Sequence, residues 1–281
     1  MTAYMDHKDL ANETVDSQRA GKISDGVHRV LDGIAEAESA AGRDAGSVKL
    51  LAATKTRDVG EIMAAIDAGV RMIGENRPQE IQAKAEGLRR LCAQRGFALG
   101  RDDAVGSGAA AAAEERADMV HIPFHVIGQL QANKIGKVLP VVDTIESVDS
   151  LLSAERLSRR AVARGITVGV LLEVNESGEK TKSGCSPASA VELAGQIGVL
   201  DGLELQGLMT IGANVEDEKK VREGFAHLRR TRDQILSSAE PGTSSCKELS
   251  MGMTHDMAAA VAEGSTVVRM GTAIFGERAF I

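Results

Sequence analysis

The chain is poor in aromatic side chains, with no tryptophan, one tyrosine and five phenylalanines in 281 residues. Proteins that hold single-stranded nucleic acids stack the bases on such rings. Basic residues are not in excess either, because 40 Asp and Glu against 33 Lys and Arg give a formal net charge of −7. Neutralising nucleic-acid phosphates needs a basic surface. Both absences argue against nucleic acid as a partner.

Long apolar runs and paired cysteines are also missing. No stretch approaches the roughly 18 apolar residues that cross a bilayer, and the opening MTAYMDHKDLANETVDSQ is too polar for a signal peptide. We therefore expect no membrane partner and a cytoplasmic location. The three cysteines, Cys92, Cys185 and Cys246, are far apart and fit neither a disulfide framework nor a zinc site. We expect them to be reduced and without a functional role.

Apolar runs typical of buried strands alternate with helical patterns along the chain. A first amphipathic helix is expected after Ser24, where Val27, Val30 and Ile34 recur at helical spacing. The eight expected strands lie at 48–53, 70–73, 124–127, 141–145, 167–174, 203–209, 247–250 and 266–270.

Strands this apolar are buried on both faces, as in a parallel sheet covered by helices. The sequence therefore predicts the α/β class and a single (β/α)8 barrel of the TIM type with an additional N-terminal helix. A doubly wound open sheet is the alternative. Its dinucleotide loop would have to be GSG at 106–108, which follows no strand and lacks the third glycine.

Two segments stand outside this alternation. Residues 1–22 show no sustained periodicity and are expected to form a flexible N-terminal tail, which leaves 23–281 as one barrel domain. Residues 92–121 contain GRDDAVGSGAAAAAEERAD, which is rich in Gly, Ala and charge and poor in core formers. We expect a partly flexible surface insertion there.

A lysine follows the first expected strand, in the stretch VKLLAATKTRD. The active site of a barrel lies at the carboxyl ends of its strands, so Lys55 would lie at the mouth. A partly desolvated lysine has a lowered pKa and can form a Schiff base with an aldehyde. The alternative is a strand-end lysine that extends into solvent, which position alone favours.

Glycines and hydroxyls follow the last two expected strands, in SMGMT (250–254) and RMGTAIFG (269–276). Barrels commonly bind phosphate at this place, with backbone N–H groups and the N-terminus of a short helix. Glycine lets the backbone approach an anion, and a threonine hydroxyl adds a donor. Either motif alone could simply serve a turn. Both together, opposite a lysine, favour a phosphorylated aldehyde as the ligand.

Seven motifs carry a specific resemblance: AATKT, GENRPQE, HVIGQLQANK, NESGEKTKSG, GLMTIGA, SMGMTHDM and VRMGTAIFGER. They resemble the pyridoxal phosphate homeostasis protein family, which is similar to the N-terminal barrel domain of alanine racemase. The resemblance runs from about residue 24 to the C-terminus, interrupted by 92–121. It implies a protein of intracellular pyridoxal 5′-phosphate (PLP) homeostasis that buffers PLP or delivers it to PLP-dependent apoenzymes.

The resemblance also implies roles for single residues. Lys55 would hold PLP covalently as an internal aldimine, and Asn76 and His125 would lie beside it. Arg269 would face the phosphate or the pyridine nitrogen, and at the nitrogen it would keep the ring unprotonated and disfavour carbanion chemistry. The residues that would bind or flank the phosphate are Ser250, Met251, Gly252, Gly271 and Thr272.

Three functions compete for this site. The first is a PLP carrier without catalytic residues, and the second is a PLP-dependent racemase or decarboxylase. Racemisation on this scaffold uses a tyrosine from a second domain, whereas the single tyrosine here is Tyr4 and the chain ends at Ile281. We therefore expect no enzymatic activity beyond a weak one, and a monomer. The third is an aldolase that uses Lys55 on a sugar phosphate and binds no PLP.

Two smaller questions stay open at this level. Glu75 could orient Lys55 or pair with an arginine such as Arg77. His121 and His125 are four residues apart, but no third ligand is evident, so we expect no metal.

Overall fold

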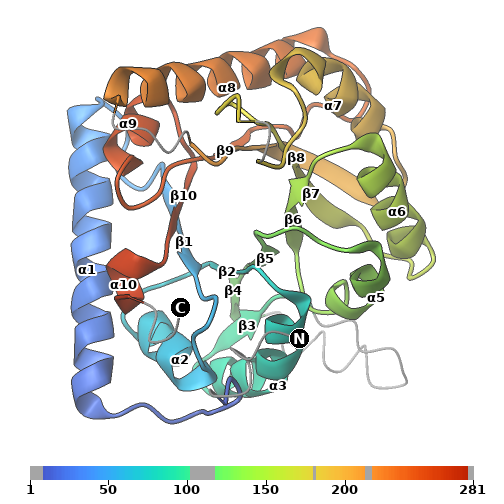
Figure 1. Cartoon of the computed structure of the whole chain (residues 1–281). Helices are drawn as coiled ribbons and strands as arrows, with labels where there is room; N and C mark the ends of the chain where they lie inside the picture. The colour runs from blue at the N-terminus through green and yellow to red at the C-terminus, as the bar shows by residue number, and fades with distance from the viewer. Residues whose placement is uncertain (1–8, 102–117, 180–181, 213–216, 278–281) are drawn as a thin grey trace.

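The computed structural model describes residues 9–101, 118–179, 182–212 and 217–277, and within them eight parallel strands close into a barrel (Figure 1). The strands, in order around the barrel, are β1 (Lys49–Ala53), β10 (Val267–Met270), β9 (Glu248–Ser250), β8 (Leu203–Met209), β7 (Val168–Glu173), β6 (Thr144–Val148), β5 (Phe124–Val126) and β2 (Ile73–Glu75). The predicted (β/α)8 barrel is confirmed.

Helices surround the barrel on the outside (Figure 1). They are α2 (Val59–Asp67), α3 (Pro78–Ala93), α5 (Ile135–Val138), α6 (Leu151–Val162), α7 (Ala190–Gly198), α8 (Glu218–Ser238), α9 (Met257–Ala262) and α10 (Thr272–Phe275), with short 3-10 turns η1 (Ala132–Lys134) and η2 (Pro187–Ser189). None of the helices in the described part of the chain is long and apolar enough to cross a membrane.

The additional N-terminal helix, α1 (Ser17–Ala40), begins earlier than predicted. Asp16 is its N-cap and accepts the N–H of Arg19 at 2.8 Å. The first turns carry no large apolar residue, and the buried stripe starts at Ile23. Hydrophobic periodicity therefore missed these turns, and the tail boundary expected at residue 22 falls inside the helix.

The chain before α1 is attached to the barrel's outer layer. The N–H of Val59 donates to the carbonyl of Leu10 at 3.2 Å, and that of Gly60 donates to Asn12 at 2.9 Å. A Cβ added at Gly60 would lie 2.6 Å from the Thr14 carbonyl, so only glycine admits this approach. Residues 1–8 of the expected flexible tail lie outside the described residues.

Two barrel strands lie later in the sequence than predicted. The expected strands at 70–73 and 141–145 are observed at Ile73–Glu75 and Thr144–Val148. Both contain a glutamate that is completely buried, Glu75 and Glu146. Each of these strands continues through its glutamate after the apolar run that predicted it has ended, so the pattern placed the strands too early.

A second small sheet was not predicted. Strands β3 (Phe97–Leu99) and β4 (Val120–Ile122) pair in parallel, and Leu99 and Ile122 belong to the core. The insertion expected at 92–121 is therefore structured at both ends, and α3 continues to Ala93. Residues 102–117, for which flexibility was predicted, lie outside the described residues.

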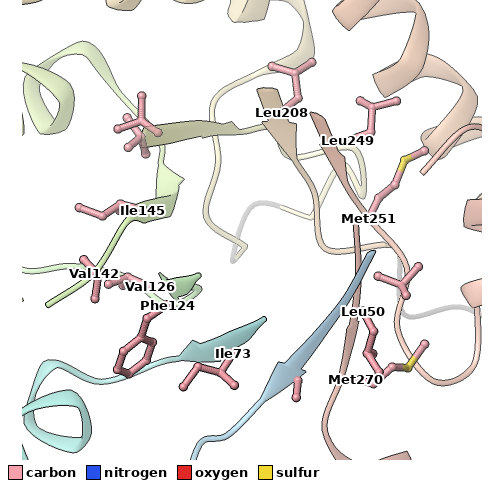
Figure 2. Packing of buried hydrophobic residues seen from close by; sticks show 14 of the residues in the cluster. Leu50, Ile73, Phe124, Val126, Val142, Ile145, Leu208, Leu249, Met251 and Met270 are labelled. Carbon is pink, nitrogen blue, oxygen red and sulfur yellow. The ribbon is translucent and has the colours of Figure 1, made fainter. Parts of the chain in front are cut away.

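Apolar side chains between strands and helices form the main core. Figure 2 shows Phe124, Ile145, Leu208 and Leu249 on the side of the strands that faces the helices. Burial of each such side chain contributes about 1.5–3 kcal/mol to folding. A separate cluster of Leu51, Met72 and Val267, with Ile127 packed against it, also forms between the strands.

Candidate functional site

The residues predicted for the site lie on five consecutive strands of the barrel, β5, β2, β1, β10 and β9. Because the strands are parallel, their carboxyl ends meet at one face, and the structure gathers these residues in one sector of it. They are His125 on β5, Asn76 after β2, Lys55 after β1, Arg269 on β10 with Gly271 and Thr272 after it, and Ser250 on β9 with Met251 and Gly252 after it.

Lys55 occupies a tight turn directly after β1. The N–H of Arg57 donates to the Thr54 carbonyl at 3.0 Å, so Lys55 and Thr56 are the two central residues of the turn. Thr56 has φ of 67°, a left-handed conformation that turns usually assign to glycine or asparagine. Lys55 itself is half-buried.

A buried charged cluster lies beneath this turn. Its centre is Lys84 of α3, whose Nζ donates to Glu75 Oε1 at 2.6 Å, to Glu80 Oε2 at 3.0 Å and to the Thr54 carbonyl at 3.0 Å. The Thr54 hydroxyl also donates to Glu75 Oε1, at 2.7 Å. We call these four residues the Lys84 cluster. Lys84 and Thr54 are completely buried.

Glu75 therefore pairs with Lys84 of the next helix. Burial raises the pKa of the Glu75 carboxyl, although the charge of Lys84 acts in the opposite direction. Lys84 compensates the carboxyl with a cation and a hydrogen bond to Oε1, whereas Oε2 is buried without a hydrogen-bond partner among the residues that the structure describes.

A second series of hydrogen-bonded polar side chains crosses the barrel interior. His125 Nδ1 lies 2.7 Å from Glu146 Oε1, and the Ser250 hydroxyl donates to Glu146 Oε2 at 2.6 Å. Arg269 donates to the Ser250 hydroxyl at 2.6 Å and to the Thr210 carbonyl at 2.7 Å. Its Nη1 also lies 4.0 Å from Glu146 Oε2. These hydrogen bonds therefore hold the Arg269 guanidinium in a fixed place inside the barrel.

The surroundings shift the pKa values of two charged groups in this series, Glu146 and Arg269. Burial raises the pKa of Glu146, but the hydrogen bond and charge of His125 and the charge of Arg269 outweigh it and lower the pKa overall. Burial lowers the pKa of Arg269, against the effect of Glu146. Arginine side chains do not lose their proton in proteins, so Arg269 stays charged.

Two residues predicted near the phosphate use their side chains elsewhere. The Ser250 hydroxyl is engaged by Glu146 and Arg269, and the Met251 side chain is completely buried in the core (Figure 2). Their backbone is engaged as well, because the Met251 N–H donates to the Val267 carbonyl and the Ser250 carbonyl accepts the Thr210 N–H, both at 3.1 Å.

Gly252 and Gly271 lie in neighbouring loops, after β9 and β10. Gly252 has φ of 97°, and an added Cβ would lie 2.5 Å from that of Ala260, so the position requires glycine. Gly271 precedes α10, whose first N–H groups, beginning with Thr272, have no carbonyl partner within the helix. The Thr272 side chain is exposed. These loops offer backbone donors and one hydroxyl to an anion.

Asn76 supplies an unused acceptor to the same sector. Among the residues that the structure describes, its Oδ1 is a buried atom with no hydrogen-bond partner. A Cβ added at Gly128 would lie 2.5 Å from the Asn76 carbonyl, so the glycine of HVIGQ allows this packing. A buried acceptor without a donor is costly unless a ligand or water satisfies it.

Sequence reasoning missed Glu146 and Lys84, which organise the two polar groups. Glu146 lies one residue beyond the end of the strand expected at 141–145. Lys84 is four residues after Glu80, the spacing of a helical ion pair, which could have indicated it.

The histidines and cysteines form no metal centre in the described ranges, which hold no group of three or more potential ligands. His121 Nε2 lies 3.2 Å from Asp143, whereas His125 lies against Glu146. All three cysteines are free and buried.

Comparison with known proteins agrees with the motifs. The chain matches the model of the alanine racemase N-terminal domain family over residues 34–279. The pyridoxal phosphate homeostasis protein of Aquifex aeolicus (strain VF5) is 34% identical over 254 residues, which are 90% of this chain and 97% of that protein.

Two solved structures share the fold. The crystal structure of an unknown protein from Bifidobacterium adolescentis is 71% identical with a TM-score of 0.89, and the match covers 95% of this chain and 100% of the other. PipY of Synechococcus elongatus PCC7942, solved with PLP bound, is 31% identical with a TM-score of 0.63 over 86% of this chain and 100% of PipY. The chain thus belongs to the alanine racemase N-terminal domain family and, within it, to the pyridoxal phosphate homeostasis proteins.

Proposed function

We propose that this chain binds PLP at the barrel mouth and acts in PLP homeostasis as a carrier without catalytic activity. One observation carries the proposal: a turn lysine after β1 lies beside two glycine-bearing loops after β10 and β9, on neighbouring strands. A lysine takes the aldehyde and an anion cradle takes the phosphate, so the pair matches the two reactive ends of PLP. The relative PipY, solved with PLP bound, supports the assignment.

Lys55 is the residue that we assign to the aldehyde. Once its amine has lost a proton, the nitrogen attacks the aldehyde carbon, a C=N bond forms and one water leaves. The bond is reversible, so a carrier can release PLP unchanged by the reverse addition of water. PLP supplies the reactive aldehyde, and the protein supplies position.

Other residues fit the remaining parts of the cofactor. The loops at Gly252 and Gly271, with the Thr272 hydroxyl, would receive the phosphate. The buried Asn76 Oδ1 would gain the donor it lacks. Met251 and Ser250 would flank the phosphate as the residues that lead into Gly252, and His125 would act through Glu146.

Arg269 favours holding the cofactor over catalysis. A permanent cation that faces the pyridine nitrogen makes protonation of that nitrogen unfavourable and weakens the ring as an electron sink. Its charge is held in place by Ser250 and Thr210. We further propose that residues 23–281 act as one PLP-binding domain, monomeric and cytoplasmic, and that PLP-dependent apoenzymes receive the cofactor.

The test is to add PLP, reduce with borohydride and map the modified peptide. We expect the label on Lys55 and its loss in Lys55→Ala, with Lys182→Ala as the matched control that keeps it. Labelling mainly on another lysine would contradict the assignment. Absence of any visible-range absorbance with PLP would favour the aldolase alternative, and rapid racemisation of amino acids by the loaded protein would refute a purely carrying role.

A further inference from the structure

The backbone beside Lys55 adopts an unfavourable conformation. Thr56 has φ of 67°, and it is a β-branched residue, for which the left-handed region is strongly disfavoured. Such outliers persist only where surrounding contacts fix them, and they cluster at functional sites. Something must therefore hold Thr56 in place.

The contact that holds it comes from α3. The Thr56 N–H donates to Glu80 Oε2 at 2.6 Å, and the same oxygen accepts from Lys84 Nζ at 3.0 Å. Glu80 is 1% exposed, so water does not compete for this bond. A charged acceptor makes it one of the stronger hydrogen bonds of the turn.

Lys84 holds the other side of the same turn. Its ammonium donates to the Thr54 carbonyl at 3.0 Å. The residues immediately before and after Lys55 are thus both fixed by one ion pair of α3.

A role in packing alone does not explain this arrangement. Lys84 lies on the apolar face of α3 with Ile81, Ala85 and Leu88, all buried. An apolar residue of similar volume is often as stabilising as a buried ion pair at such a place. Besides pairing with each other, Lys84 and Glu80 each make one hydrogen bond to the backbone that flanks Lys55.

We propose that Glu80 and Lys84 are positioning residues, which hold Thr56 in its left-handed conformation within the turn from Thr54 to Arg57 and so orient Lys55 for attack on an aldehyde. The inference rests on the proposed function of Lys55. It assigns to α3 a role in the reaction that the sequence of this helix alone does not indicate.

The test compares the rate of Schiff base formation with PLP in Glu80→Ala and in the wild type, by stopped-flow absorbance. Glu80→Ala leaves Lys84 paired with Glu75, so the buried ammonium keeps a carboxyl partner. We expect the rate to fall at least about tenfold, since misplacement of a reacting group costs up to about a hundredfold. Glu86→Ala, an exposed glutamate on the same helix, is the matched control.

A rescue separates positioning from general damage. Glycine adopts the left-handed region without strain, so in a Thr56→Gly background the Glu80→Ala change should cost less than about threefold, a non-additive cycle. An equal loss in both backgrounds, or no loss in the wild-type background, overturns the inference. If Glu80→Ala does not fold, Glu80→Met, which fills the site without an oxygen acceptor, is carried through the same cycle.

Hydrogen exchange of the Thr56 amide without PLP gives an independent readout. The exchange rate should rise in Glu80→Ala and stay low in Glu86→Ala. An unchanged exchange rate in Glu80→Ala counts against the positioning role of Glu80. The position of the borohydride-reduced PLP label in the wild type tests the proposed function separately. A label away from Lys55 refutes the proposed function, whereas a label on Lys55 with an unaffected Glu80→Ala rate refutes only this inference.

Discussion

Glu146 and Arg269 face each other across the barrel, with Glu146 Oε2 4.0 Å from Arg269 Nη1 and the Ser250 hydroxyl bonded to both. Their strands, β6 and β10, lie on opposite sides of the closed strand order. The interior of the barrel is thus crossed by one compensated pair of charges, which holds the guanidinium below the mouth.

Replacing Glu146 with Gln should destabilise the fold strongly. The substitution keeps the shape but leaves the buried Arg269 without its carboxylate. Breaking a buried ion pair costs about 3–5 kcal/mol. Urea unfolding measures the loss, and Glu223→Gln on the exposed face of α8 should change stability by less than about 0.5 kcal/mol. A loss below about 1 kcal/mol for Glu146→Gln would show that the pair is not structurally important.

The same pair should make stability depend on pH. Despite burial, its partners hold the pKa of Glu146 below the usual value, so the stability it contributes is present above the carboxyl pKa of an unfolded chain and is lost as pH falls through the folded pKa. The gap in unfolding free energy between wild type and Glu146→Gln should therefore narrow below about pH 4.3. Paired urea titrations at several pH values test this. If the difference in unfolding free energy widens at low pH, the direction given for the Glu146 pKa shift is wrong.

The phosphate should decide the affinity for PLP. Charge-assisted hydrogen bonds contribute about 1.5–3 kcal/mol each, so pyridoxal, which lacks the phosphate, should bind at least about a hundredfold more weakly. Thr272→Val should weaken PLP and leave pyridoxal nearly unchanged. Spectroscopic titrations of both ligands give the four affinities. Equal affinity for PLP and pyridoxal in the wild type would remove the anion cradle from the proposal.

The three cysteines should be inert in the folded protein. Burial raises the pKa of Cys92 and Cys185 to about 11 and that of Cys246 to about 12, so few thiolates exist near neutral pH. Labelling with a thiol-specific disulfide reagent should be slow and limited by unfolding, and complete in urea. Fast labelling of any cysteine in the native protein would contradict this.

The sequence predicted the architecture because most barrel strands are apolar runs that the sequence pattern identifies. It placed two of them early, where the strands continue through Glu75 and Glu146. It also missed the start of α1, whose polar first turns show no periodicity. In each case the missing signal is a tertiary contact, which a local pattern does not contain.

The site was predictable in outline and unpredictable in its supports. Lys55, Gly252 and Gly271 could be found because strand ends meet at one face of a barrel. Lys84 could not be separated from an ordinary helix lysine, because its burial depends on Glu75 and Thr54, which come from other segments. The contacts of Arg269 were likewise not predictable from its own strand, because its partners Ser250, Thr210 and Glu146 come from other strands and loops.

The pairing of β1 with β10, which sets Lys49 opposite Val267, joins the earliest and latest strands of the barrel. A growing chain therefore carries Lys55 long before the loop at Gly271 exists, and the two meet only when the last strand is added. A ligand bonded at both places would hold the first and last strands of the barrel together in the folded state. Opening the barrel at this seam would then require release of the ligand, so that a loaded protein is more stable against unfolding than an empty one.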